Sequence, residues 1–155
     1  MAASQRNKGM RAERELFALL SDLLGIAVQR NYAARWEGGC DSLSIPGWAI
    51  EAKRHESLSI TAWWAQTQKQ ADHTSRRPIL FYRQSRRPWR AVLDLQDLAP
   101  ATFPCRGALA EIGLEAAAQA IRESLEIRCH TNPRKVATGQ GKALPAATVA
   151  DHENS

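Results

Sequence analysis

The sequence has little cysteine and no cysteine motif. Its three cysteines, Cys40, Cys105 and Cys129, lie far apart and form no Cys-x-x-Cys pair. The pattern therefore signals neither a disulfide framework nor a zinc site, and it favours a reducing compartment. The four histidines also lack the spacing of metal ligands, which favours surface positions for them.

Long apolar runs and phosphate-binding loops are also missing. The most apolar stretch, residues 16–28, is interrupted by Ser21 and Asp22, and the charged first fifteen residues contain no apolar signal segment. We therefore expect a cytoplasmic protein without a membrane segment. No glycine-rich phosphate loop is present, which argues against an ATP-driven motor and against a nucleotide cofactor.

Composition indicates one folded domain with an anionic partner. The chain has 155 residues, of which 44% are hydrophobic and 24% charged, as in an ordinary globular domain. Lysine and arginine number 21 against 16 aspartate and glutamate, and the whole excess lies in the first hundred residues, with 15 basic against 10 acidic. A formal charge of +5 favours a nucleic acid as partner.

Hydrophobic periodicity and turn residues predict the order αβββαββ, followed by a C-terminal helix. A loop and this helix occupy residues 99–130, and we expect the helix to pack on the domain or across a dimer. Residues 131–155 have too few apolar side chains to fold, which predicts a disordered tail. The expected elements are a helix at 5–24, strands at 26–32 and on both sides of residues 46–47, a helix at 59–72, strands at 76–84 and 89–95, and a helix at 109–128.

The stretch CDSLSIPGWAIEAKR, residues 40–54, is typical of a short hairpin turning at Pro46-Gly47. Alternation along a strand places Glu51 and Lys53 on one face. Folding back at the turn then brings Asp41 beside them, so that two acids and an amine converge. The same alternation also fits a strand with one solvated face, and this alternative stays open at the level of the hairpin.

A second acid lies on an apolar helical stripe. At about 100° per residue, Glu13 falls among Leu16, Phe17 and Leu20, whereas Glu15 falls on the opposite face. Burying an unpaired carboxylate costs several kcal/mol, so Glu13 needs a cation, a basic partner or water. Because Glu13 lies near the start of the helix, a solvent-exposed helix end explains its place on the apolar stripe equally well.

Taken together, these motifs resemble the archaeal-type Holliday junction resolvase branch of the PD-(D/E)xK nuclease superfamily. The likeness covers about residues 5–95, and the Trp-rich AWWAQ helix and the RRPWRAVLDL strand are similar to those of short phage-encoded members. The residues that carry it are Lys8-Gly9, Glu13-Arg14-Glu15-Leu16, Asp41 and Ile50-Glu51-Ala52-Lys53.

The resemblance implies an α/β fold with a restriction-endonuclease-like core, a mixed central β-sheet flanked by helices, at residues 1–98. It implies that Asp41 and Glu51 bind the metal, that Lys53 is the catalytic lysine and that Glu13 is the helix-borne acid of resolvases. Mg2+ prefers oxygen ligands, so two carboxylates and a backbone carbonyl, that of Ala52, suit it. We expect Mn2+ to substitute.

Further residues are candidates for the site or for DNA contacts. Gln66 and Gln70 resemble the glutamine that follows Glu-x-Lys in the superfamily, although a solvated helix face explains them as well. Paired arginines around two strands suit a rim that contacts phosphates, and they are also ordinary solubilising surface. The basic candidates for DNA binding are Lys8, Arg11, Arg35, Arg54, Arg76, Arg77, Arg86 and Arg87.

The resemblance and the residues favour a metal-dependent endonuclease that cuts branched DNA as a homodimer in phage recombination or repair. Resolution of a four-way junction requires two incisions, and one chain supplies one set of site residues. The alternatives are a monomeric structure-specific or nicking nuclease and a DNA-binding module without turnover. The intact set Asp41, Glu51 and Lys53 favours the enzyme, because a binding module has no need of all three.

Overall fold

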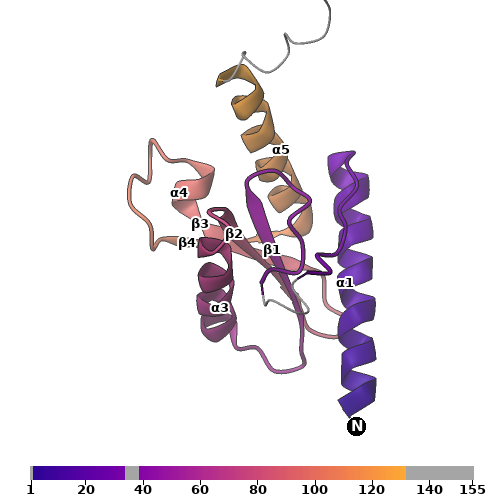
Figure 1. The fold of residues 1–155 in the computed structure, drawn as a ribbon. Coiled ribbons are helices and arrows are strands. Elements are labelled where there is room, and N and C mark those ends of the chain that lie inside the picture. Colours follow the sequence, from indigo (N-terminus) through magenta and orange to yellow (C-terminus); the bar gives the residue numbers. More distant parts are fainter. Residues whose placement is uncertain (1, 34–38, 132–155) are drawn as a thin grey trace, which may run out of the picture.

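A computed structural model describes residues 2–33 and 39–131 (Figure 1). One four-stranded sheet, in the order β1-β2-β3-β4, forms its centre. None of the helices in these ranges is long and apolar enough to cross a bilayer. The elements are α1 (Ala2–Leu24), β1 (Trp48–Arg54), α3 (Ile60–Asp72), β2 (Arg77–Arg83), β3 (Arg90–Asp94), α4 (Leu95–Leu98), β4 (Leu109–Gly113) and α5 (Leu114–Thr131).

The sheet is mixed and carries helices on both faces. β1 pairs with β2 in parallel, whereas β2 with β3 and β3 with β4 are antiparallel. The parallel pair requires a crossover, which α3 supplies. α3 covers one face of the sheet, and α1 and α5 lie on the other (Figure 1). The predicted α/β class with a mixed, helix-flanked sheet is confirmed.

Helix α1 forms as its apolar periodicity predicts. Ala12, Leu16 and Leu20 recur at helical spacing and are buried against the sheet, which gives the helix most of its stability. The helix ends where Gly25 adopts a positive φ of 69°, with its N–H donating to the Ser21 carbonyl at 2.9 Å. A left-handed residue at this position favours glycine. This end is the one that the sequence indicated.

The two strands predicted before β1, at residues 26–32 and directly before the turn at residues 46–47, do not form as regular strands. Residues 26–31 form none, because hydroxyl groups replace the ladder: Ser21 Oγ accepts the Val28 N–H and Ser44 Oγ accepts the Gln29 N–H, each at 2.9 Å. The first arm of the hairpin is reduced to one antiparallel bridge between Ser42 and Ile50. In the described ranges the order is therefore αβαββαβα, and not αβββαββ followed by a C-terminal helix.

The helix predicted over residues 109–128 begins five residues later. Residues Leu109–Gly113 form the edge strand β4 instead, with Ala110 and Ile112 turned inward and Glu111 exposed. Pairing with β3 overrides the helix propensity of this Leu, Ala and Glu segment. α5 then follows, and its residues Leu114 and Ile121 join the core between α1 and the sheet. Of the tail predicted at residues 131–155, Thr131 is instead the last residue of α5, and residues 132–155 lie outside the described residues.

Candidate active site

Three carboxylates and one lysine meet beside the carboxyl-terminal half of β1. Glu13 comes from α1, Asp41 from the segment that precedes the strand, and Glu51 and Lys53 from β1 itself. We call these four residues the acid cluster. The burial of Glu13 and Glu51 raises the pKa of each, and the charge of Asp41 raises both further.

Backbone pairing fixes Asp41 against the strand. Ser42 and Ile50 exchange two backbone hydrogen bonds of 3.1 and 2.9 Å. In a strand, the N–H and carbonyl of one residue point to the same edge, and the next residue points both groups to the opposite edge. Ala52, two residues after Ile50, therefore presents its N–H and carbonyl to the same edge as Ile50. There Asp41 Oδ2 accepts the Ala52 N–H at 2.8 Å. Asp41 therefore lies beside residues 51–53, as the predicted hairpin requires. The Ala52 carbonyl faces the same edge.

Glu51 is the most buried member of the acid cluster. Only 3% of the residue is exposed, and Lys53 Nζ donates to its Oε1 at 2.7 Å. Its Oε2 is buried and has no hydrogen-bond partner in the described part of the chain. Burial, with the nearby Asp41 charge, raises the pKa of the carboxyl to about 7, although Lys53 opposes the shift. An acid held in this way is poised to bind a cation.

Glu13 has the cationic partner that its position on an apolar stripe required. Arg30 Nη2 lies 3.3 Å from Glu13 Oε2, and the glutamate side chain is 16% exposed. Burial raises the pKa of Glu13, Asp41 raises it further, and Arg30 and Lys53 lower it. The sequence indicated a cation, a basic partner or water beside Glu13, but it did not single out Arg30, because this residue lies in an irregular segment with no motif of its own.

The two candidate glutamines have different places. Gln70 Nε2 donates to the Gly39 carbonyl at 3.0 Å, so α3 holds the chain two residues before Asp41. The Oε1 of the same side chain is buried without a hydrogen-bond partner among the described residues. Gln66 is exposed on α3, and its side chain makes no hydrogen bond within residues 2–33 and 39–131. The structure thus brings Gln70, and not Gln66, to the segment that carries Asp41.

A family model described as "Phage putative PDDEXK endonuclease" matches residues 4–104, which include the whole acid cluster. The chain belongs to this family. No curated protein sequence matches it. Among solved structures, the chain is similar to Archaeoglobus fulgidus Hjc, a Holliday junction resolvase from an archaeal hyperthermophile, with 20% identity and a TM-score of 0.42 over 71% of this chain and 88% of that one. The predicted membership of the PD-(D/E)xK nucleases is confirmed.

The basic side chains predicted to contact DNA fall into two groups in this endonuclease. Lys8 and Arg11 are exposed on α1, and Arg86 and Arg87 are exposed at the turn between β2 and β3. Arg54 is half-buried directly after Lys53. These five remain available to an anionic ligand. Arg35 lies outside the described residues.

Arg76 and Arg77 are engaged within the protein instead. Arg76 Nη1 donates to the Leu43 carbonyl at 2.6 Å and so braces the loop before β1. The Arg77 guanidinium lies 4.1 Å from the centre of the Trp48 ring and donates to the Asp97 carbonyl and to Ser124 Oγ at 3.3 and 3.1 Å. Their predicted role as phosphate contacts stays a prediction, and their observed role is structural.

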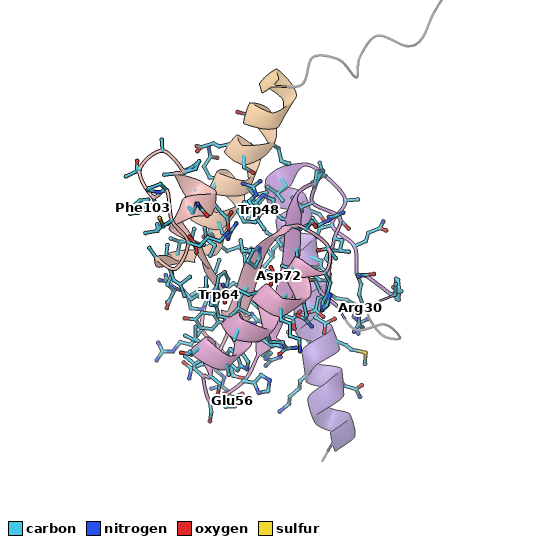
Figure 2. The ribbon with its side chains drawn as sticks, turned by 60° about the vertical axis from the view of Figure 1, so that its left-hand side comes forward. Arg30, Trp48, Glu56, Trp64, Asp72 and Phe103 are labelled. Atoms are coloured by element: carbon cyan, nitrogen blue, oxygen red, sulfur yellow. The ribbon has the colours of Figure 1, made fainter. Side chains whose placement is uncertain are left out.

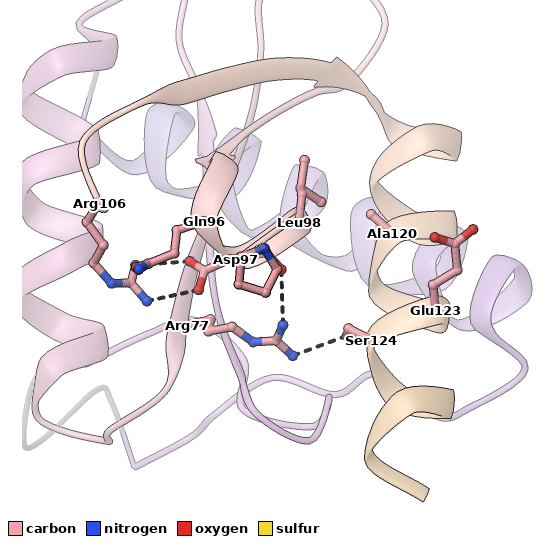
Figure 3. A pocket seen from close by; sticks show the side chains of 9 residues that line it. Arg77, Gln96, Asp97, Leu98, Arg106, Ala120, Glu123 and Ser124 are labelled. Carbon is pink, nitrogen blue, oxygen red and sulfur yellow. Dashed lines mark hydrogen bonds and ion pairs between the residues drawn. The ribbon is translucent and has the colours of Figure 1, made fainter. Parts of the chain in front are cut away.

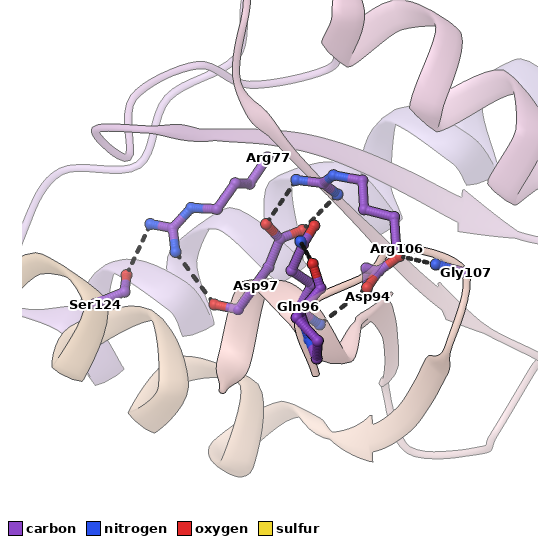
Figure 4. Close-up of polar contacts among 8 residues, drawn as sticks. Arg77, Asp94, Gln96, Asp97, Arg106, Gly107 and Ser124 are labelled. Carbon is purple, nitrogen blue, oxygen red and sulfur yellow. Dashed lines mark hydrogen bonds and ion pairs between the residues drawn. The ribbon is translucent and has the colours of Figure 1, made fainter. Parts of the chain in front are cut away.

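A pocket of about 490 Å³ lies beside Arg77, between α4 and α5 (Figure 3). Asp97 accepts two hydrogen bonds from Arg106, at 3.0 and 2.9 Å, and Asp94 accepts the Gln96 and Gly107 N–H groups at 2.9 and 2.7 Å (Figure 4). These contacts tie the 95–108 loop to the sheet. Since Arg77, Asp97 and Arg106 already have partners within the fold, the pocket is a weaker candidate than the acid cluster.

Proposed function

We propose that the chain is a metal-dependent endodeoxyribonuclease that hydrolyses phosphodiester bonds in branched DNA such as Holliday junctions. Membership of a phage endonuclease family supports a nuclease. The observation that carries the proposal is the convergence of Asp41 and Glu51 beside Lys53, with one buried Glu51 oxygen left without a donor.

The donor set fits Mg2+, with Mn2+ as a substitute. Asp41 and Glu51 supply carboxylate oxygens, and the Ala52 carbonyl faces the same strand edge, so every donor is an oxygen, as a hard cation prefers. No group of three or more His, Cys, Asp or Glu side chains within residues 2–33 and 39–131 is placed to hold a metal. The proposed set therefore uses two carboxylates and one carbonyl, which leaves room for water and phosphate.

The chain's own residues account for the other requirements of hydrolysis. When bound, a divalent ion offsets the negative charge of the transition state and lowers the pKa of water. Lys53 now neutralises Glu51, and in the complex its ammonium is available to orient the attacking water or to stabilise charge on the phosphate. Glu13, restrained by Arg30, adds a third carboxylate that orders water at the edge of the acid cluster.

Branched DNA and a homodimer are the finer parts of the proposal. Resolving a four-way junction requires two symmetrically placed incisions, and one chain provides one acid cluster. A twofold dimer provides two. The alternatives are a monomer that nicks or cuts flaps, and a DNA-binding module without turnover.

The test compares labelled four-way junction, flap and linear duplex of identical sequence, each with magnesium and with EDTA. We expect paired cuts in the junction, weak cutting of linear duplex and none in EDTA. Asp41→Asn, purified in parallel, controls for contaminating nuclease. Cleavage in EDTA would refute metal dependence, and equal cutting of duplex would refute branch specificity.

Sedimentation, alone and with junction DNA, tests the assembly. A twofold mass is expected in the complex. A single-chain mass in both samples, with one strand cut per junction, would replace the resolvase by a monomeric structure-specific nuclease.

A further inference from the structure

A smaller pocket, of about 290 Å³, lies between the first turns of α1 and the loop that follows β1. Its lining is Lys8, Arg54, His55, Glu56 and Ser57. Glu56 marks this end of the molecule, opposite to the end of β1 that carries Trp48 (Figure 2). We call it the basic pocket.

The basic pocket has an excess of positive charge that the protein does not neutralise. Lys8 and Arg54 form no ion pair in the described part of the chain, whereas Arg30, Lys53 and Arg83 each have a carboxylate partner. The one acid of the lining, Glu56, accepts a hydrogen bond from Ser85 Oγ, and Arg54 Nη2 donates to the same hydroxyl at 3.3 Å. Unpaired cations in a concave site favour an anionic ligand.

The His55 wall of the basic pocket is held by packing. The His55 ring lies 5.2 Å from the ring of Trp63 on α3, and Trp63 lies 6.3 Å from Tyr82 in the sheet. The His55 N–H donates to the Arg83 carbonyl at 3.3 Å, so the chain still follows β2 one residue beyond β1. A ligand here would meet a preformed surface on the His55 side, whereas the exposed Lys8 side chain would become ordered on binding.

Both walls of the basic pocket lie a short distance along the chain from a residue of the acid cluster. His55 lies two residues beyond Lys53 in extended chain, which is about 6.6 Å. Lys8 precedes Glu13 by five helical residues, or about 7.5 Å along α1. Both walls are thus displaced from the acid cluster toward the same end of the fold, by a distance that suits the next phosphate of one DNA strand.

We propose that the basic pocket binds the DNA phosphate adjacent to the scissile one, through Lys8 and Arg54, with the His55 ring and the Ser57 hydroxyl as further parts of its lining. This inference rests on the proposed function, because it takes the acid cluster as the place of cleavage. The basic pocket then sets which phosphate of the strand reaches Asp41 and Glu51.

The test measures junction binding by the wild type and by Lys8→Gln/Arg54→Gln at several salt concentrations, in EDTA. We expect the slope of log K against log salt to fall by about 0.9, the loss of one phosphate contact. Lys69→Gln is the control, because it removes an exposed positive charge of α3 that has no ion pair in the described ranges. An unchanged slope in the double variant, or the same fall in the control, overturns the inference.

A second measurement identifies the phosphate in question. A methylphosphonate placed next to the scissile position removes one negative charge from the substrate. We expect it to slow cleavage by the wild type and to add nothing to the defect of Lys8→Gln/Arg54→Gln, because this variant lacks both cations proposed to bind that phosphate. Effects that multiply would mean that the two changes act at separate sites, against the inference.

The two proposals fail differently. If the slope differs between wild type and double variant as expected, but the wild type cuts nothing in magnesium, the proposed function is refuted. The basic pocket then remains a phosphate-binding site. Cleavage with no slope change and no coupling would refute the basic pocket and leave the nuclease. Wild-type protein that binds no DNA would refute both.

Discussion

Two buried charged regions lie at opposite ends of the β1 and β2 pair, and they treat their charges differently. At the amino-terminal end, the side chain of Asp97 is 4% exposed and accepts two hydrogen bonds from the Arg106 guanidinium. At the carboxyl-terminal end, three carboxylates share the cations of Arg30 and Lys53. The first region is matched within the protein, and the second has an excess of negative charge.

The difference separates a structural role from a functional one. A buried acid costs desolvation energy in either region, and pairing offsets this cost only around Asp97. In the acid cluster the cost remains as the raised pKa of Glu13, Asp41 and Glu51. Groups kept in this state at the expense of stability are typical of sites that receive a charged ligand.

The largest expected effect breaks the acid cluster. Asp41→Asn and Glu51→Gln each remove a proposed metal ligand. Loss of a residue that only supports a metal ligand costs about 10- to 100-fold in activity, so cleavage by either variant should fall by more than that. DNA affinity should hold, since neither residue contacts phosphate. Single-turnover cleavage and anisotropy of bound junction measure the two. Cleavage within a few-fold of wild type in either variant would place the active site elsewhere.

The next effect is on stability as a function of pH. The folded pKa of Glu51, about 7, exceeds its ordinary value of 4.5, so the native state keeps its proton to higher pH than the unfolded state. The metal-free protein should therefore lose stability as pH rises through this window, by on the order of 3 kcal/mol in total. Below the window both states are protonated, and above it the penalty is complete.

Urea unfolding in EDTA at about pH 5 and about pH 8 measures this loss. Glu51→Gln should reduce it, although Asp41 and Glu13 contribute in the same direction. Magnesium at the higher pH should restore stability to the wild type and not to the variant, since it binds only the native state. Equal pH dependence in both proteins would contradict the raised pKa.

The acid cluster was more predictable from the sequence than the elements around it. Alternation and a Pro-Gly turn predict that Asp41 lies near Glu51 and Lys53, and helical periodicity places Glu13 on the apolar stripe, although only the resemblance to the nucleases favoured a site over a solvated face or helix end. Both depend on local geometry. Arg30 was missed because its contact with Glu13 joins an irregular segment to a helix, which no period describes.

The strand assignments failed where tertiary contacts decide. Residues 26–32 have strand-like composition, but serine hydroxyls take the backbone donors there. Leu109–Gly113 has helical composition, and pairing with β3 makes it a strand. Arg76 and Arg77 read as surface arginines because their partners, the Leu43 carbonyl and the Trp48 ring, are distant in the sequence.

A smaller effect is expected when the matched region is broken. Asp97→Asn leaves Arg106 without its carboxylate and should destabilise the fold by about 1–3 kcal/mol, with cleavage by the folded protein unchanged. The control is Glu111→Gln: both partners of its ion pair with Arg90 are more than 40% exposed, so a cost of less than about 1 kcal/mol is expected. Urea unfolding and cleavage assays at low temperature decide. A loss of activity without loss of stability in Asp97→Asn would mean that both charged regions are functional.

The smallest effect concerns the two glutamines of α3, which lie one helical turn apart. Gln70→Ala removes the hydrogen bond to the Gly39 carbonyl and loosens the segment that carries Asp41, so cleavage should fall about tenfold, as for a residue that orients a metal ligand. Gln66→Ala, an exposed position on the same helix, should leave the rate unchanged. Because Gln70 acts through Asp41, its variant should also need more magnesium for half-maximal rate, a shift that general destabilisation of α3 does not produce. Magnesium titrations of both variants measure it, and equal behaviour of the two would show that the contact with Gly39 does not position the acid cluster.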